Sequence, residues 1–235
     1  MLSKLKKELE GLADKKRTEA SLRYFKTAPG QYGHGDKFLG LNSANQRQLA
    51  KKYFALSFPD LQKLLDSQWH EYRAISLLIL MQQYRKADAK KQTAIFNFYL
   101  KNKERINNWD LVDISCPHIV GLYLLDKPKE RKVLLDLAKS EHLWSKRIAL
   151  ISTFAFIRHD DFYYSLKIAK LLLSDQHDLI HKALGWTLRE IGKRDLATEK
   201  EFLKQNFSKL PRTALRYAIE KFSEKTRQRY LKKKI

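Results

Sequence analysis

The sequence predicts an all-α protein, a HEAT-like helical-repeat solenoid, or α-α superhelix, with a concave basic groove. Apolar residues recur at helical spacing, as in LLILMQQY and LKIAKLLL. Alternating β-branched runs flanked by tight turns, which mark strands, are absent. A basic residue beside an alanine recurs at intervals typical of helical repeats. Because no linker interrupts this pattern, we expect a single domain over residues 1–235.

Four of the five prolines are placed as helix starts, where the missing N–H costs nothing. They are Pro59, Pro117, Pro128 and Pro211. The segments between them are short, which indicates helices joined by tight connections.

The repeat is clearest at four alanines. From Ala149 to Ala183 is 34 positions, from Ala183 to Ala214 is 31, and from Ala74 to Ala149 is 75, about two such steps. Stacked helical pairs form a solenoid whose second helices line one face. We therefore expect the accompanying basic residues to point into one groove, although coincidence in a basic chain stays open. These residues are Arg73, Arg147, Lys182 and Arg212.

The charge balance is strongly positive. Lys and Arg number 47 against 26 Asp and Glu, a formal net charge of +21. Such a field attracts polyanions, and we expect nucleic acid rather than a membrane surface, because no helix combines a bare apolar face with a cationic one. A merely basic or ribosome-associated protein is the alternative. The tail KTRQRYLKKK is expected to contact polyanions nonspecifically.

The remaining composition indicates a cytoplasmic protein. The single cysteine, Cys116, excludes an internal disulfide framework and suits a reducing compartment. No apolar run approaches the roughly 20 residues of a membrane helix. The charged N-terminal segment lacks the apolar core of a signal peptide.

The stretch NNWDLVD is an acidic and aromatic cluster within this basic chain. Leu111 lies about halfway between Ala74 and Ala149, so one repeat carries Trp and Asp where its neighbours carry cations. Trp109 and Asp113 are four residues apart and share a helix face. Asp110 is expected on another face, as an acid that stabilises the helix N-terminus.

The glycine-rich stretch PGQYGHGDKFLG, residues 29–40, resembles a phosphate loop only superficially. Asp36 stands where that motif needs lysine, and no strand precedes it. The following Ser43 begins a capping-box pattern with Gln46. Ser43 therefore marks a helix N-terminus that either holds a DNA phosphate or simply ends a connecting loop.

Other candidates lie in the C-terminal half. His177 and His181 have metal-pair spacing but no evident third ligand, so we expect solvated histidines, no metal and no cofactor. Trp186 and Arg189 share one helix face, and Trp186 is either core or a binding residue. Arg189 is expected to line the DNA-binding groove together with the basic residues of the repeats. Gly185 allows a close approach to this helix.

The chain resembles the AlkD family of DNA alkylation repair glycosylases over nearly its whole length. The matching segments, in order, are RYFKTAPGQYGHGDKFLG, HEYRAISLLIL, NNWDLVDIS, LWSKRIAL, KALGWTLREIGKR and PRTALRYAIEKF. The glycine-rich stretch and Asn42, where another member has glutamine, depart from the family pattern. They put contacts to the undamaged strand in doubt.

The resemblance implies roles for several residues. Asp113 matches the catalytic aspartate, and Trp109 and Trp186 match aromatic residues that flank the lesion. Tyr24 matches a tyrosine near the lesion, and Arg147 matches an arginine that contacts DNA. The implied reaction is hydrolysis of the N-glycosidic bond of N3- and N7-alkylated purines in double-stranded DNA by a monomer, without a base-flipping pocket.

The mechanism expected from the residues is electrostatic. A cationic alkylated base is already a good leaving group, so a carboxylate that stabilises an oxocarbenium-like sugar and orients water suffices. Neutral lesions such as uracil are expected to be poor substrates. Two alternatives stay open: a non-catalytic scaffold that binds damaged or branched DNA, and a protein-interaction module with an acidic partner.

Overall fold

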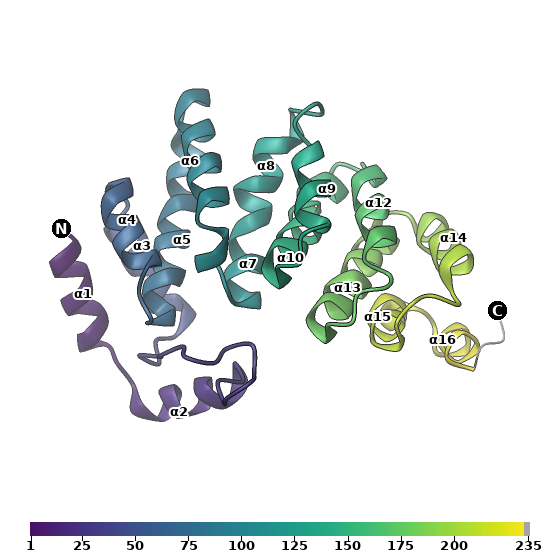
Figure 1. Ribbon diagram of the computed structural model, residues 1–235, viewed down its shortest axis with the longest axis horizontal. Coiled ribbons are helices and arrows are strands. Elements are labelled where there is room, and N and C mark those ends of the chain that lie inside the picture. The colour runs from purple at the N-terminus through teal and green to yellow at the C-terminus, as the bar shows by residue number, and fades with distance from the viewer. Residues whose placement is uncertain (233–235) are drawn as a thin grey trace. The chain divides into compact units, whose positions relative to one another are not determined.

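The computed structural model describes residues 1–232 of the chain, and they form helices joined by turns (Figure 1). Within these residues the only β-type pairing is an isolated bridge between Lys37 and Trp69. The predicted all-α helical-repeat fold is confirmed. Two residues of the basic tail, Lys233 and Lys234, lie outside the described residues.

The chain divides into two compact units, residues 1–115 and 116–235, and the boundary falls between α7 and η2. The single domain expected over residues 1–235 stays a prediction. The helices of the first unit are α1 (Leu2–Gly11), α2 (Lys15–Tyr24), α3 (Ser43–Lys52), α4 (Phe58–Leu65), α5 (His70–Lys86), α6 (Ala89–Lys101), η1 (Lys103–Arg105) and α7 (Trp109–Ser115). The helices of the second are η2 (Cys116–His118), α8 (Val120–Leu125), α9 (Lys132–Ala138), α10 (Leu143–Ser152), α11 (Phe154–Ile157), α12 (Tyr163–Leu171), α13 (Asp178–Arg194), α14 (Leu196–Asn206), α15 (Arg212–Ala218), η3 (Ile219–Lys221) and α16 (Glu224–Leu231).

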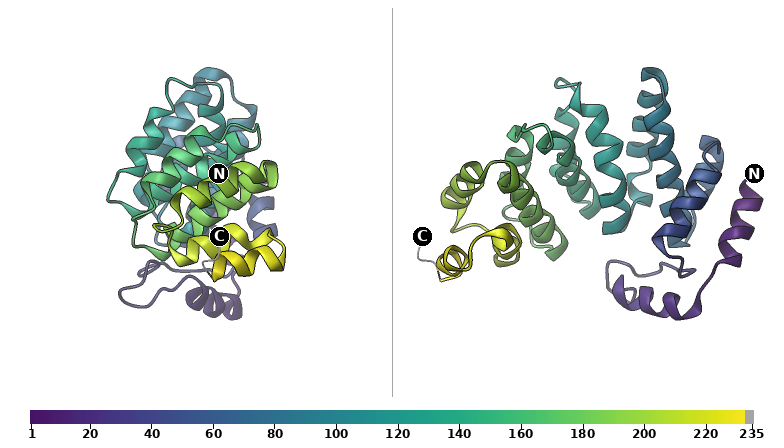
Figure 2. Two further views of the ribbon diagram at one scale, coloured as in Figure 1. Left: turned by 90° about the vertical axis from the view of Figure 1, so that its right-hand side faces the viewer. Right: turned by 180° about the vertical axis from the view of Figure 1, so that it is seen from behind.

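Helix α5 is the centre of the first unit. It packs against α3, α4, α6 and α7, and most of its residues are buried, so it is enclosed around most of its circumference rather than along one stripe. The segment between α2 and α3 runs without helix along the same unit (Figure 2). This segment contains the glycine-rich stretch.

The recurring alanines are packing positions. Ala74, Ala149, Ala183 and Ala214 are all buried, with exposed fractions of 2%, 0%, 0% and 0%, on α5, α10, α13 and α15. In the second unit the close approach expected at Gly185 is confirmed, because a Cβ there would lie 2.3 Å from the carbonyl oxygen of Ala214. Small residues therefore let α13 and α15 pack closely.

The prolines mark helix starts only in part. Pro59 lies in the first turn of α4, and Pro211 is the N-cap of α15, as predicted. Pro117 lies in the short helix η2. For Pro128 the prediction is wrong, since α9 begins only at Lys132. Arg131 lies between α8 and α9. Its guanidinium donates hydrogen bonds to the carbonyls of Leu124 and Leu125 and so caps the C-terminal end of α8.

Candidate functional site

Helix α7 is anchored on one side and presents its polar residues on the other. Leu111 and Val112 are fully buried. Tyr99 donates its hydroxyl to Ser115 Oγ at 2.9 Å, which fixes the end of the helix. Trp109 and Asp113, one turn apart, are only partly buried. The predicted shared face of these two residues is therefore on the accessible side of α7.

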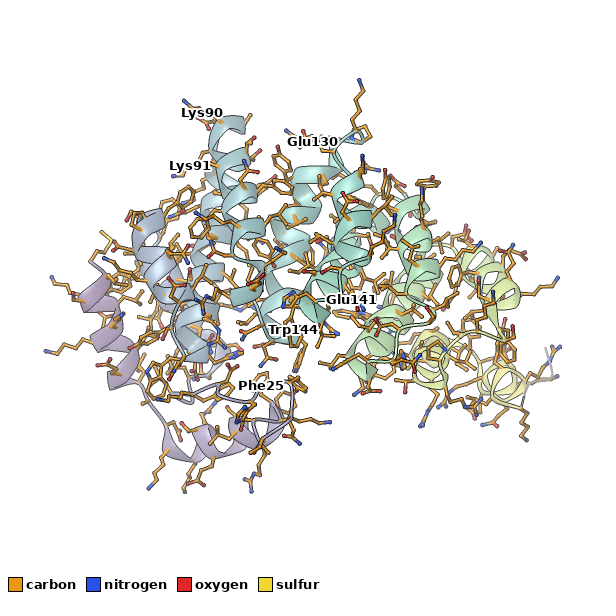
Figure 3. All side chains as sticks on the ribbon, viewed as in Figure 1. Phe25, Lys90, Lys91, Glu130, Glu141 and Trp144 are labelled. Atoms are coloured by element: carbon orange, nitrogen blue, oxygen red, sulfur yellow. The ribbon has the colours of Figure 1, made fainter. Side chains whose placement is uncertain are left out.

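Aromatic rings from the α2 end surround Trp109. The ring centroid of Tyr24 lies 5.8 Å from that of Trp109, edge to face, and Tyr24 is 66% exposed. Phe25 lies 5.6 Å from Trp109 and is labelled in Figure 3 between α2 and α7. The indole Nε1 of Trp109 donates to the hydroxyl of Tyr32 at 3.2 Å. The structure thus brings together Tyr24 and Trp109, which the sequence analysis selected separately.

Beneath these rings lies a buried group of charges that the sequence analysis missed. His70 donates Nε2–H to Asp110 at 2.8 Å and Nδ1–H to Asp36 at 3.4 Å. Arg73 places Nη2 2.8 Å from the other oxygen of Asp36. Asn108 also donates to Asp36, at 3.4 Å. Residues far apart in sequence therefore form one network below Trp109.

The network holds His70 in its charged form. Burial alone lowers the pKa of His70, but the charge and hydrogen bond of Asp110 and the hydrogen bond to Asp36 raise it to about 9. Burial likewise raises the pKa of Asp36, but His70 and Arg73 outweigh it and lower the pKa below its usual value. Both ring nitrogens of His70 are thus committed to carboxylates.

Two expectations are corrected by this network. Asp110 lies in the first turn of α7, as expected, and its Oδ1 accepts the N–H of Leu111 at 2.8 Å. The expectation that it faces elsewhere is wrong, because its Oδ2 is the partner of His70, on the same side as Trp109. Arg73 was expected in the basic groove, but it is 3% exposed, and its guanidinium is used by Asp36 and the carbonyl of Ser67. A guanidinium buried in this way is not presented to phosphate.

The glycine-rich stretch is fixed by a second buried carboxylate. Glu71 is 3% exposed and accepts the backbone N–H groups of Leu39, Gly40 and Leu41 at 2.9, 2.8 and 3.3 Å. Gly40 has φ +81°, and a Cβ there would meet the backbone of Asp14 at 2.3 Å. These N–H groups are therefore not available to cradle phosphate, which agrees with the rejection of a phosphate loop.

The start of α3 is one residue earlier than its capping pattern suggested. Asn42 is the N-cap, and its side chain accepts the N–H of Asn45 at 2.8 Å. Gln46 donates to the carbonyl of Leu41, not to a capping serine. Ser43 is the first helical residue and is exposed, so the capping role predicted for it is wrong. Its expected phosphate contact stays a prediction.

The first unit also contains a hollow of about 280 Å³. Its inner wall includes the buried side chains of Phe38, His70 and Leu78. Trp109 and Asp110 form one side, and the Asp110 side chain is 23% exposed. The hollow lies between α2, α3, α5 and α7.

In the second unit, Arg147 and Trp186 are partly or fully covered. Arg147 is 4% exposed and donates to the carbonyl of Leu179 at 2.6 Å. Trp186 packs its ring edge-on against Phe154, with centroids 4.7 Å apart, and donates Nε1–H to Glu190 at 2.9 Å. Trp186 is thus half core and half polar surface.

The other predicted cations of this unit lie nearer the surface. Lys182 forms an ion pair with Asp178 at 2.8 Å. Arg189 is paired with Glu220. Arg212 is exposed and donates to the carbonyl of Leu231 at 2.9 Å. The ion pair between Lys182 and Asp178 is exposed to solvent, and such pairs contribute little to stability.

The histidine pair has structural roles. His177 caps α13 by accepting the N–H of Leu179, and His181 donates to the carbonyl of Asp175 at 2.5 Å. Within residues 1–232, no group of three or more His, Cys, Asp or Glu side chains is arranged to hold a metal ion. No helix of the described part of the chain is long and apolar enough to cross a membrane.

The family follows from the match to known sequences. A family model described as DNA alkylation repair enzyme matches residues 5–222. The chain belongs to this family. No curated protein matches the sequence. Among solved structures, one described as a predicted DNA alkylation repair enzyme from Enterococcus faecalis has a TM-score of 0.70 and 17% identity, and the match covers 90% of this chain and 97% of that one. This likeness supports the fold, and the family supplies DNA as the substrate.

Proposed function

We propose that this DNA alkylation repair enzyme is a DNA glycosylase that releases N3- and N7-alkylated purines from duplex DNA by hydrolysis of the N-glycosidic bond. The observation that carries the proposal is the grouping of Tyr24 and Trp109 on the side of α7 that also carries Asp113. An accessible carboxylate beside aromatic faces suits a reaction in which positive charge develops on the sugar.

Asp113 is proposed to stabilise the oxocarbenium-like sugar and to orient the attacking water. Its one-turn spacing from Trp109 lets the indole face lie against the cationic base or sugar while the carboxylate faces the anomeric carbon. Such cation–π contacts contribute about 0.5–2 kcal/mol each. Trp186 is proposed to contact the same DNA, as the family resemblance implies. Arg147 is as buried as Arg73, so the DNA contact that the resemblance implies for it requires its guanidinium to leave the carbonyl of Leu179.

The substrate range follows from how the protonated His70 is held beneath Trp109. The proton of His70 closest to this surface is held by Asp110, and its other N–H is held by Asp36. Neither is positioned to protonate a neutral leaving base. Alkylated purines bring their own positive charge, so they should be released efficiently, whereas uracil and hypoxanthine should not.

The direct test is release of methylated bases from duplex DNA under single-turnover conditions. Asp113→Asn keeps the shape of the side chain and removes its charge. We expect excision to fall by about 100-fold or more, the order seen when one preorganised electrostatic group is lost. Duplex affinity should stay the same or increase, because a repulsion with phosphate is removed. Asp136→Asn, at an exposed position on α9, is the matched control.

The alternative function is a non-catalytic scaffold for damaged or branched DNA. The same assay separates the two, since a scaffold binds the duplex without releasing bases. Comparable release of hypoxanthine and methylated purines would contradict the proposed mechanism, because it would require a proton donor.

A further inference from the structure

The second unit contains a groove that the proposed reaction does not use. It lies between α14 and α16, the helices nearest the yellow end of the chain in Figure 1, and has a volume of about 750 Å³. The residues proposed to contact DNA in this unit lie on α10, α13 and α15 instead. Helix α16 carries most of the basic tail KTRQRYLKKK, for which the sequence predicts only nonspecific contacts. The structure gives part of this tail a defined surface.

The floor of the groove is apolar. Phe207, directly after α14, and Tyr230 of α16 pack edge to face with ring centroids 6.2 Å apart. Phe222 packs against the same tyrosine at 5.5 Å. Ala197 lies on the wall of the groove and is exposed, so its methyl group fills little of the space. A floor of this kind can accept one apolar side chain of a ligand.

The rim of the groove is cationic. Lys200 and Lys204, one turn apart on α14, are exposed, and Arg229 is exposed on the wall that α16 forms. Among the described residues that line the groove, Glu201 is the one carboxylate. Burial raises the pKa of Glu199, the other acid of α14, to about 8, so this side chain adds no negative charge at neutral pH. The groove therefore attracts acidic groups.

Both walls are held in place without a ligand. The side chain of Asp195 caps α14 by accepting the N–H groups of Ala197 and Thr198 at 2.9 and 3.1 Å. Arg212 of α15 donates to the carbonyl of Leu231 at 2.9 Å and so fixes the end of α16. The groove is therefore preorganised, and little ordering of the protein opposes binding.

These features favour a peptide over nucleic acid. A duplex would reach the lysines on the rim but leave the apolar floor uncovered, because its phosphates carry no apolar group. A single strand binds by stacking bases on exposed ring faces, whereas Tyr230 is 8% exposed and its ring packs against Phe207 and Phe222. A peptide supplies carboxylates for the rim and an apolar side chain for the floor.

We propose that this groove binds an acidic, extended segment of a partner protein, with its carboxylates on Lys200 and Lys204 and one apolar side chain against Phe207 and Tyr230. Charge complementarity at the rim selects the acidic segment, and the apolar floor distinguishes it from other polyanions. The proposed partner contact is separate from the glycosylase reaction, since it uses none of the residues assigned to that reaction.

A fluorescein-labelled peptide tests the proposal with the full-length protein. The probe is a short peptide of alternating aspartate and glycine with one central phenylalanine. Its binding is followed by fluorescence anisotropy at about 0.15 M salt, where attraction to distant charges is screened. A second peptide with serine in place of the phenylalanine has the same charge. We expect it to bind about tenfold more weakly, because it cannot bury an aromatic side chain.

Two charge reversals locate the bound peptide. Lys204→Glu reverses a charge on the rim, and Lys209→Glu reverses one at an exposed position in the turn after α14. Both variants have the same net charge, so a general attraction to the basic chain would weaken equally in each. We expect Lys204→Glu to lose about tenfold more affinity for the phenylalanine peptide than Lys209→Glu, because a rim charge next to the peptide becomes repulsive.

A third variant fills the groove without changing its charge. Ala197→Phe places a ring in the space where the peptide side chain would lie, so it should also weaken binding about tenfold. Ala94→Phe, at an exposed position on α6, is the matched control and should bind as the wild type does. Urea unfolding of each variant verifies that it is folded.

Equal affinity for the two peptides would overturn the proposal, because binding would then be purely electrostatic. Equal losses in Lys204→Glu and Lys209→Glu would overturn it too, as would the absence of binding up to about 1 mM peptide. If Lys204→Glu lost more duplex affinity or base release than Lys209→Glu, the groove would belong to the DNA contact and the proposal would be wrong. None of the peptide results bears on the glycosylase, since that reaction is measured separately on methylated DNA.

Discussion

The two units of this protein contain buried ionisable side chains that are stabilised in different ways. The first unit buries a paired network, in which His70 and Arg73 lie between Asp36 and Asp110. In the second unit Glu199 is 2% exposed and its Oε1 has no hydrogen-bond partner among residues 1–232. Burial raises the pKa of Glu199 to about 8, although Arg189 and Lys200 oppose it. The network of the first unit thus keeps its buried groups charged by pairing them, whereas Glu199 of the second unit is a buried acid that stays neutral.

The difference shows that a recurring sequence position does not fix a role. Arg73 and Arg212 both precede a packed alanine in a repeat, yet Arg73 is buried and Arg212 is exposed. The cause is the glycine-rich stretch, which brings Asp36 onto α5 and supplies a counterion for Arg73. The position in the repeat determines which side of the helix is packed. A neighbouring segment determines whether the basic residue beside the alanine is buried with a counterion or exposed.

The largest expected effect is on stability at these two arginines. Arg73→Ala removes the guanidinium that lies 2.8 Å from Asp36 and leaves this buried carboxylate with only His70 and Asn108, so we expect a loss of about 3–5 kcal/mol in the free energy of unfolding. Arg212→Ala should change it by less than about 0.5 kcal/mol. Urea unfolding measures both. Similar losses would mean that Arg73 is not a structural ion.

The second largest effect is expected in the pH dependence of the free energy of unfolding, and it depends on the charge of His70. Its folded pKa of about 9 lies above the usual 6.5, so its ion pairs stabilise fully below pH 6.5 and are lost as the pH rises through 9. Between pH 6 and pH 10 the wild type should lose roughly 3 kcal/mol relative to His70→Gln. Urea unfolding across this range is the measurement. His159→Gln, at an exposed position, should show no such trend.

The stability of the protein should also fall with rising pH because of Glu199. Here burial raises the pKa, whereas for His70 the carboxylate partners raise it. The raised folded pKa of Glu199 favours the protonated form, so stability is full below about pH 4.5 and falls as the pH rises through 8. Relative to the wild type, Glu199→Gln should gain stability between pH 4.5 and pH 9, by at most about 5 kcal/mol, the value of a shift from 4.5 to about 8. Thermal or urea unfolding at pH 5 and pH 9 checks this, with Glu201→Gln, at an exposed position, as control. An equal gain at both pH values would contradict a neutral Glu199.

The smallest effect is expected on DNA binding by Arg212. If about six phosphates are contacted, affinity should fall with salt with a log–log slope of about −5. Arg212→Ala should reduce this slope by about 0.9, the value of one phosphate. Arg158→Ala, an exposed arginine outside the repeat position, is the control. An unchanged slope for Arg212→Ala would remove this residue from the DNA contact.

Part of the site could be predicted from the sequence, because the spacing of residues along a helix determines which of them share a face. The four-residue interval between Trp109 and Asp113 places both on one face of any helix that contains them. Asp36 and His70 gave no such signal, since they lie 34 positions apart and meet only when the stretch between α2 and α3 folds back onto α5. The contact of Asp110 with His70 was missed for the same reason, since the two residues lie 40 positions apart.

The sequence by itself determined the helical class, the packed alanines of the repeats, the family, and the pairing of Trp109 with Asp113. The helical class, the packed alanines and the shared helix face of Trp109 and Asp113 follow from spacing over a few residues, whereas the family follows from the resemblance of several segments in order. Tertiary structure alone decided which cations are buried, that His70 is charged, and that a hollow lies beside Trp109. Burial and counterions depend on segments distant in the chain, and the free energy of a charge depends mainly on them.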